Sequence, residues 1–195
     1  MKDILSIALQ NQEKARKIID KINLIPIWKS VGAEPHLVGS LRMGLLMKHR
    51  DIDFHIYSDP LDITQSFTAI QKIAENPSII QIEYKNLSAT EEKCLEWHAW
   101  YRDEENDLWQ IDMIHILKGS FYDGYFEKMA DRILTLLTPE TKETILRLKN
   151  ETPENEKIMG VEYYQAVLRD GIRHYSEFEK WRAQNPVNGI LHWIP

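Results

Sequence analysis

The stretch GSLRMGLLMKHRDIDF (residues 39–54) carries most of what this sequence says about its fold. It opens with a Gly-Ser pair and ends in an Asp-apolar-Asp triplet that begins a strand-like run, DIDFHIYS (51–58). Residues two apart on a strand point to one face, so Asp51 and Asp53 project together while their apolar neighbours pack on the other side. Two carboxylates held so close repel each other unless a cation or water screens them. The pair therefore suits a divalent-metal site better than a buried strand.

A third carboxylate stands in a similar setting. Asp112 is the only charge in WQIDMIHI (109–116), a strand-like and mostly apolar run. An isolated buried charge is costly unless it is paired or bound to a metal. If this strand lies beside residues 51–58, Asp112 reaches the same metal site as Asp51 and Asp53. Hard carboxylate oxygens favour Mg²⁺ or Mn²⁺ over zinc, and two such ions stabilise the attacking and leaving oxygens of phosphoryl transfer.

The Gly-Ser pair predicts a phosphate contact. Gly39 lets the backbone approach a phosphate closely and adopt unusual torsions. Ser40 begins a turn of helix, whose free N–H groups favour an anion and whose hydroxyl adds a hydrogen bond. Arg42 and Arg50, with Lys48 between them, are candidate counter-charges. We therefore expect a phosphate-bearing ligand bound between this turn and the metal ions.

These residues together resemble the signature of the nucleotidyltransferase superfamily typified by DNA polymerase β. That signature is Gly-Gly/Ser, a spacer, Asp-apolar-Asp/Glu on a strand, and a third acid on a later strand. Gly39, Ser40, Asp51, Asp53 and Asp112 match it in order, with ten residues between Ser40 and Asp51. The resemblance covers residues 25–118 at the level of motifs.

The sequence also departs from the signature. Leu41 and Met43 stand where many small members carry arginines, with Arg42 between them. Arg50 replaces a serine before Asp51. These changes alter the expected phosphate contacts and leave the metal ligands intact.

The resemblance implies an α+β fold: a nucleotidyltransferase-like mixed sheet with flanking helices over residues 1–118, followed by a C-terminal helical domain over 119–195. It implies a Mg²⁺-dependent (or Mn²⁺-dependent) enzyme that moves a nucleoside monophosphate from an NTP, with ATP expected, to an acceptor hydroxyl and releases pyrophosphate. Asp51 and Asp53 would bind both metals, and Asp112 the catalytic metal beside the acceptor. Gly39 and Ser40 would hold the β- and γ-phosphates. Relatives place base and phosphate contacts near Lys157, Tyr163 and Tyr164.

Hydrophobic periodicity agrees with this division. The front predicts a helix over 3–30 that Pro26 kinks or ends, strands at 35–39, 51–58 and 78–86, a helix at 62–75 capped by Asp62, and a hairpin of 94–102 and 108–117 around the acidic turn DEEND (103–107). The rear predicts helices at 121–137, 139–150 and 160–183. Thr138 and Thr152, each followed by a proline, are candidates to cap the helices after them. The nearly continuous apolarity of 108–117 predicts burial of that strand on both faces.

The composition of the chain limits the kinds of partner that it is expected to bind. The chain of 195 residues has a net charge of −6, with 9 Lys/Arg against 6 Asp/Glu in residues 1–57 and the acidic excess in the remainder. An acidic protein repels a phosphate backbone, so we expect a small hydroxyl-bearing acceptor rather than a nucleic acid. The charged N-terminal stretch and the lack of a long apolar run predict no signal peptide and no membrane span, and hence a cytoplasmic protein. The one cysteine, Cys94, excludes an internal disulfide.

Three other interpretations compete with this one. A solvated strand end would explain an Asp-apolar-Asp triplet standing alone. The chain could be a non-catalytic nucleotide-binding or toxin–antitoxin-like interaction module on the same fold, or a metal-dependent phosphohydrolase. His55, His98 and His115 are interpreted as structural because their spacing suits no histidine metal site, although His98 and Glu96, on the strand next to Asp112, could contact the acceptor.

Overall fold

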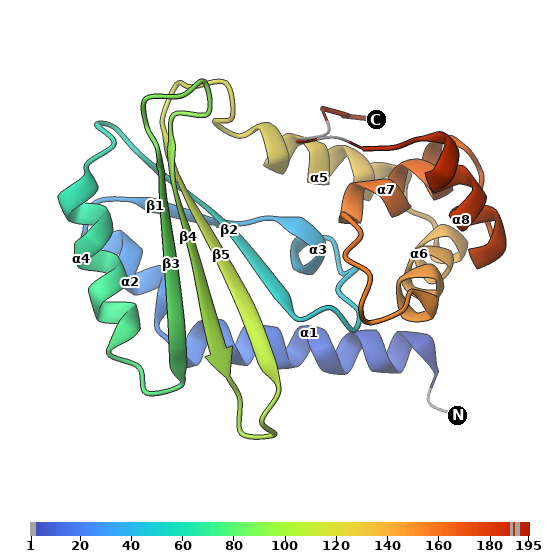
Figure 1. The fold of residues 1–195 in the computed structure, drawn as a ribbon, viewed down its shortest axis with the longest axis horizontal. Helices are drawn as coiled ribbons and strands as arrows, with labels where there is room; N and C mark the ends of the chain where they lie inside the picture. Colours follow the sequence, from blue (N-terminus) through green and yellow to red (C-terminus); the bar gives the residue numbers. More distant parts are fainter. Residues whose placement is uncertain (1–2, 188, 190–191) are drawn as a thin grey trace.

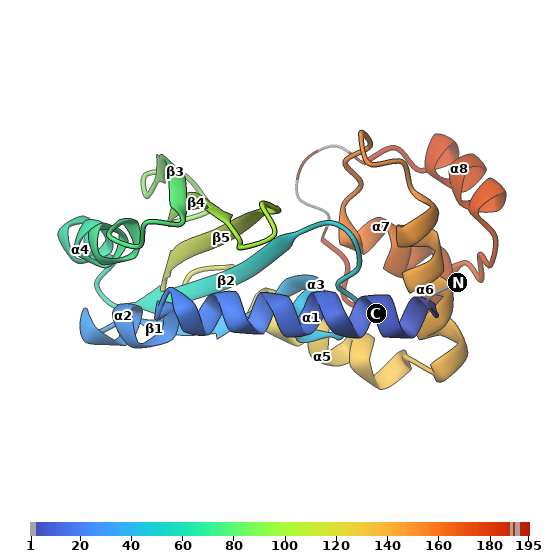
Figure 2. The same ribbon diagram turned by 90° about the horizontal axis from the view of Figure 1, so that it is seen from below.

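A mixed five-stranded sheet forms one half of the molecule, and the C-terminal helices form the other (Figures 1 and 2). The computed structural model describes residues 3–187, 189 and 192–195. The spatial order is β1 (Glu34–Leu37), β2 (Asp51–Ser58), β5 (Leu108–Leu117), β4 (Cys94–Arg102) and β3 (Ile79–Leu87). Strands β2 and β5 run parallel, and the other neighbouring strands are antiparallel. This mixed sheet with flanking helices confirms the predicted α+β fold.

The helices divide into those that precede or interrupt the sheet and those that follow it. The first group comprises α1 (Ile4–Lys21), α2 (Leu24–Ser30), α3 (Gly39–Arg42) and α4 (Ile63–Ala74). The second comprises α5 (Tyr125–Leu136), α6 (Pro139–Glu151), α7 (Gly160–Tyr164), the π-helical turn η1 (Gln165–Arg169) and α8 (Tyr175–Gln184). No helix in the described part of the chain is long and apolar enough to cross a membrane.

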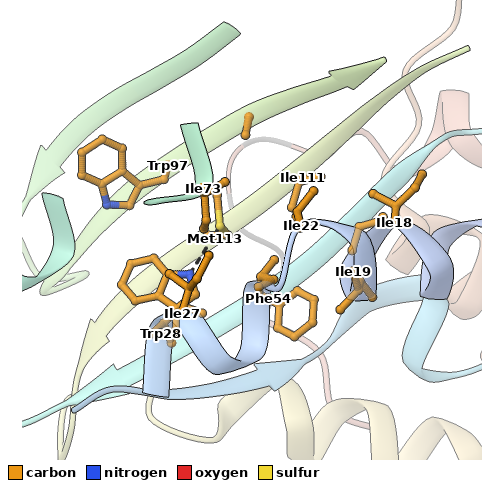
Figure 3. Packing of buried hydrophobic residues seen from close by; sticks show 14 of the residues in the cluster. Ile18, Ile19, Ile22, Ile27, Trp28, Phe54, Ile73, Trp97, Ile111 and Met113 are labelled. Carbon is orange, nitrogen blue, oxygen red and sulfur yellow. Dashed lines mark hydrogen bonds between the residues drawn. The ribbon is translucent and has the colours of Figure 1, made fainter. Parts of the chain in front are cut away.

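Helices α1, α2 and α4 cover one face of the sheet and bury its main core. Side chains of these helices pack against the alternate residues of β2, β4 and β5 that point toward them (Figure 3). Trp28 of α2 is fully buried there, and its indole N–H donates to the Met113 sulfur at 3.5 Å. Alternation along the strands places the other residues of β2, Asp51 and Asp53 among them, on the opposite face. One face of the sheet therefore packs in the hydrophobic core, and the other face carries Asp51 and Asp53.

The C-terminal helices have a core of their own. Met129, Ile133, Ile145 and Phe178 are among its buried members, and the segment after α3 inserts Met43 and Leu45 into it. A smaller cluster of Ala8, Met47 and Leu146 joins α1 to α6. Figure 2 shows α1 running beneath the sheet as far as this rear part. The division at residue 118 stays a proposal, because the two parts share these contacts.

Two helix starts follow the predicted capping chemistry. The Asp62 carboxylate accepts from the Gln65 N–H at 3.0 Å and begins α4. Thr138 accepts from the Thr141 N–H at 3.2 Å and begins α6, with Pro139 in the first turn, where a missing N–H costs nothing.

Three predicted elements are wrong in detail. The helix over 3–30 is two helices, because Asn23 adopts a left-handed backbone with φ of 54°, and Pro26 lies in the first turn of the second helix instead of at the break. The helix over 160–183 is also broken, since Gly171 has φ of 71° between η1 and α8. Strand β5 is buried on one face only over its first part: Trp109, Ile111 and Met113 are buried, while Gln110 and Asp112 between them are partly exposed on the other side. Near its end His115 and Ile116, on opposite faces, are both buried.

His115 is held in its neutral form by its surroundings. Ser58 donates its hydroxyl hydrogen to the Pro60 carbonyl at 2.9 Å, so His115 Nε2, 2.7 Å from the same Ser58 oxygen, must carry the N–H. Its Nδ1 has no hydrogen-bond partner among the described residues. A proton added there would be buried without an acceptor, and burial lowers the pKa of His115 to about 4. Burial likewise lowers the pKa of His55 to about 4.

These two histidines predict a fold that loses stability in acid. The unfolded chain binds protons near pH 6.5 that the folded chain does not, so the free energy of unfolding falls between pH 6.5 and 4, by up to about 3 kcal/mol per histidine. His115→Gln keeps a donor in place of Nε2 and cannot titrate. Urea unfolding at pH 7 and 4.5 should show about half of this histidine contribution lost in the variant. An unchanged pH dependence would contradict the assignment to His115.

Candidate active site

The three predicted carboxylates lie on neighbouring strands. In the parallel pairing of β2 and β5, Asp51 lies opposite Gln110, and Asp53 lies opposite Asp112. All three acids are partly exposed, whereas Ile52 is fully buried in the core below. The prediction that the two strands are neighbours is therefore confirmed. Parallel pairing has brought together acids that are about 60 residues apart in the chain.

The Gly-Ser turn packs directly over Asp53. Gly39 has φ of 65°, a left-handed conformation that side chains disfavour, and a Cβ added to it would collide with the Asp53 carboxylate. The backbone N–H of Val38 donates to the Asp53 carbonyl at 2.9 Å and fixes this approach. Both the torsion and the close contact require glycine at position 39.

A cleft of about 790 Å³ opens between the sheet and the C-terminal helices. Its front wall is the turn at Gly39 and Ser40 with the exposed face of β2 and β5, including all three acids. Its rear wall includes Lys149 of α6 and Tyr164 of α7. The acids therefore line a space that is large enough for a nucleotide-sized ligand.

Comparison with known proteins identifies the fold. No family model and no curated protein matches the sequence. Among solved structures, the chain is similar to Cid1 poly(U) polymerase with MgGTP bound (TM-score 0.58, 16% identity, 82% of this chain and 50% of that chain). It is also similar to a cytoplasmic RNA terminal U-transferase (0.52, 18%, 80% and 46%) and to the GLD-2–GLD-3 poly(A) polymerase complex (0.52, 11%, 86% and 58%). The chain has the nucleotidyltransferase fold.

The resemblance seen in the sequence is thus confirmed at the level of the fold. Identities this low carry the fold alone. The chain spans about half the length of the solved structures that it matches. The function of this chain therefore depends on the residues of its own cleft.

The electrostatics of the three carboxylates favour a bound cation. Burial raises the pKa of Asp51, and the charges of Lys149 and His49 oppose that rise. Burial, followed by the charges of Asp51 and Asp112, raises the pKa of Asp53 well above its usual range. Lys149 offsets this only in part. Acids that repel one another in a cleft, with hard oxygen donors, fit a divalent ion such as Mg²⁺.

A second group of possible ligands fits a metal less well. Glu92, Cys94 and Glu96 on and beside β4 have ligand atoms within 4.8 Å of one another. Burial raises the pKa of the Cys94 thiol to about 12, so it stays protonated and is a poor ligand. Asp51, Asp53 and Asp112 are instead all carboxylates that line the cleft.

Lys149 lines the cleft and was not predicted from the sequence. Its ammonium is buried and donates to Ser40 Oγ at 2.7 Å, the Leu45 carbonyl at 3.1 Å and the Tyr164 hydroxyl at 3.3 Å. Ser40 and Tyr164 also lie within hydrogen-bond distance of each other, at 3.0 Å. All three partners are neutral, so none cancels the lysine charge. One sequence signal was available: Lys149 follows Ile145 by four residues, on the buried side of a helix.

The predicted arginines take different places. Arg42 donates to Asp131 of α5 at 2.6 Å and to the Leu37 carbonyl at 3.3 Å, and it does not line the cleft. Arg50 lines the cleft mouth and pairs with Asp107 at 2.8 Å. Lys48 and Lys157 also line the cleft. The structure therefore brings Arg50, but not Arg42, to the expected site.

Gly39→Ala tests the close approach of the turn to Asp53. We expect a stability loss of about 1–2 kcal/mol from the left-handed backbone, together with weaker Mn²⁺ binding as the new methyl group displaces Asp53. Gly32→Ala is the matched control: Gly32 has φ of 80°, but a Cβ there meets nothing within 4 Å. Thermal unfolding and Mn²⁺ titration of both variants would separate the backbone cost from the collision. Equal metal binding in the two variants would contradict the predicted collision between residue 39 and Asp53.

Proposed function

We propose that this chain is a metal-dependent nucleotidyltransferase that moves a nucleoside monophosphate from an NTP to an acceptor hydroxyl and releases pyrophosphate. The observation that carries the proposal is the row of acids Asp51, Asp53 and Asp112 beneath a turn whose torsion and close contact favour glycine at position 39. The acids repel one another, which costs stability, and the left-handed torsion with the close contact restricts the turn to glycine. Features that cost stability and converge in a cleft are typical of catalytic sites.

Each residue has a distinct part in this mechanism. Asp51, Asp53 and Asp112 would hold Mg²⁺, which when bound supplies the charge that steadies the attacking and leaving oxygens. Gly39 and Ser40 would bind the β- and γ-phosphates through backbone N–H groups and the hydroxyl. Lys149, already in contact with Ser40, would neutralise those phosphates from the opposite wall. Catalysis by such a site is positioning and charge neutralisation rather than covalent chemistry.

For the acceptor, we propose a small molecule with a free hydroxyl. Beyond Asp112 the same sheet face continues across β4 and β3, where His98 lies opposite Asp112 and Glu83 lies opposite His98. Glu96 lies on this face too, and Lys85 pairs with it at 3.4 Å. With the net charge of −6, this surface suits a neutral or cationic molecule better than a polyanion.

The second candidate acceptor is the 3′ end of an RNA. It is favoured by the solved structures with the same fold, which include an RNA terminal U-transferase and a complex of Cid1 with its short product ApU. The cations at the cleft mouth, Lys48, Arg50 and Lys157, could contact one or two terminal phosphates.

One screen separates these proposals. Pyrophosphate release would be measured for each of the four NTPs with Mg²⁺, against hydroxyl-bearing small molecules and against a single-stranded RNA with a free or a blocked 3′ end. Release that depends on a small molecule supports the first acceptor, and release with the free RNA alone supports the second. Phosphate release without an acceptor would instead indicate a hydrolase. Nucleotide binding without any turnover would indicate the non-catalytic module.

A further inference from the structure

Two side chains on the sheet surface bind the same oxygen of Asp112. His98 of β4 lies opposite Asp112 in register, and its Nδ1 is 2.7 Å from Oδ1. Gln110, two residues before Asp112 on β5, donates its amide N–H to that same Oδ1 at 2.9 Å. A carboxylate oxygen only accepts, so His98 Nδ1 carries the hydrogen in this contact. Oδ2 makes no hydrogen bond to a side chain or backbone group of the described residues.

This arrangement gives the two carboxylate oxygens of Asp112 different roles. Two donors on one oxygen restrict rotation of the carboxylate about the Cβ–Cγ bond more than a single donor does. Oδ1 is occupied by one donor from β4 and one from β5, and Oδ2 stays available for a ligand. Asp51 and Asp53 have no such pair of side-chain donors among the described residues. Of the three acids, Asp112 alone is held in this way.

We propose that His98 and Gln110 are positioning residues that hold Asp112 so that Oδ2 is presented to a divalent ion. The inference rests on the proposed function for the identity of that ion. It adds a specific role for two residues that the three-acid signature does not include, and it replaces the prediction that His98 is merely structural. Partners that orient a metal ligand typically change metal affinity or activity by about 10- to 100-fold when removed.

The variants follow from the shape of the side chains. His98→Leu removes the donor and keeps an apolar side chain of moderate size. His98→Asn keeps a donor, because its amide nitrogen is attached to Cγ just as Nδ1 is in histidine. Gln110→Leu removes the second donor. Gln81→Leu is the matched control: Gln81 lies on the same face, in the same cross-strand row as Gln110, but its amide donates to Glu83.

The experiment measures Mn²⁺ binding to the full chain by calorimetry, with kcat and the KM for NTP as a second readout. We expect His98→Leu and Gln110→Leu to weaken Mn²⁺ binding by about 10- to 100-fold and to lower kcat more than they raise KM. His98→Asn and Gln81→Leu should stay close to the unsubstituted protein. Because the two donors share one oxygen, the double variant should lose less than the product of the single losses.

Opposite results overturn the proposal. If His98→Leu binds Mn²⁺ normally while its unfolding midpoint shifts, His98 only screens the acids in the folded state. If His98→Asn is as weak as His98→Leu, the donor is not what matters. Metal binding that depends on His98 in a protein without transfer activity would leave this inference standing and remove the proposed function. If nucleotidyl transfer is unchanged in both His98→Leu and Gln110→Leu, the proposed function stands and this inference is wrong.

Discussion

Asp53→Asn will stop nucleotidyl transfer and at the same time raise the midpoint of thermal unfolding. Activity should fall by at least about 10²–10³-fold, the scale on which one preorganised charge-stabilising group contributes to catalysis. Stability should rise because burial and two neighbouring acids hold the pKa of Asp53 well above its usual range. A carboxyl whose folded pKa is raised destabilises the fold at neutral pH, where it must ionise. The neutral amide removes that penalty.

The opposite directions of the two effects make this variant informative. A residue that only supports the fold would lose stability and activity together. Activity would be followed by pyrophosphate release and stability by calorimetry without metal, where about 1 kcal/mol corresponds to about 2–4 °C in a chain of this size. Asp20→Asn, on the exposed side of α1, is the matched control and should change neither. Retained turnover would falsify the assignment of Asp53, and a lower midpoint would contradict the repulsion account.

Lys149→Met will lower kcat/KM for the NTP by about 10²-fold or more, the usual consequence of removing a buried charge from a polar complex. The lysine is the buried cation of the cleft and contacts the serine that we place on the phosphates. Its removal should leave the fold intact, since Ser40 and Tyr164 both lose the ammonium but stay within hydrogen-bond distance of each other. Of the three acceptors, the Leu45 carbonyl is the one that has no such replacement. Methionine fills a similar volume in an apolar helix face.

Lys142→Met gives the comparison. Lys142 lies on the same helix, seven residues earlier, and does not line the cleft. Steady-state kinetics of both variants, with NTP binding measured by calorimetry, should show the loss at Lys149 alone. Equal kinetics in the two variants would mean that Lys149 serves the packing of α6 and takes no part in phosphate binding.

Most features that depend on residues close together in the sequence were predicted correctly, and most features that depend on contacts between distant residues were not. Alternation within β2 was sufficient to put Asp51 and Asp53 on one face, because side-chain direction on a strand follows from the backbone itself. Capping by Asp62 and Thr138 was equally local. The breaks at Asn23 and Gly171 escaped prediction, because apolar residues continued at helical spacing on both sides and packing chose where the chain turned. Strand β5 looked buried on both faces because its composition does not reveal the cleft.

The sequence by itself determined the mixed fold, the three acids and the glycine turn, since each has a local signature in residue type and spacing. The tertiary structure alone decided which cations face those acids. Arg42, close to the turn in sequence, is bound to Asp131, while Lys149, more than a hundred residues after Ser40, is bound to it directly. It also decided that His98 and Gln110 share one oxygen of Asp112. The physical reason is that a long side chain binds whatever partner folding brings within reach, and that partner is set by how sheet and helices pack together.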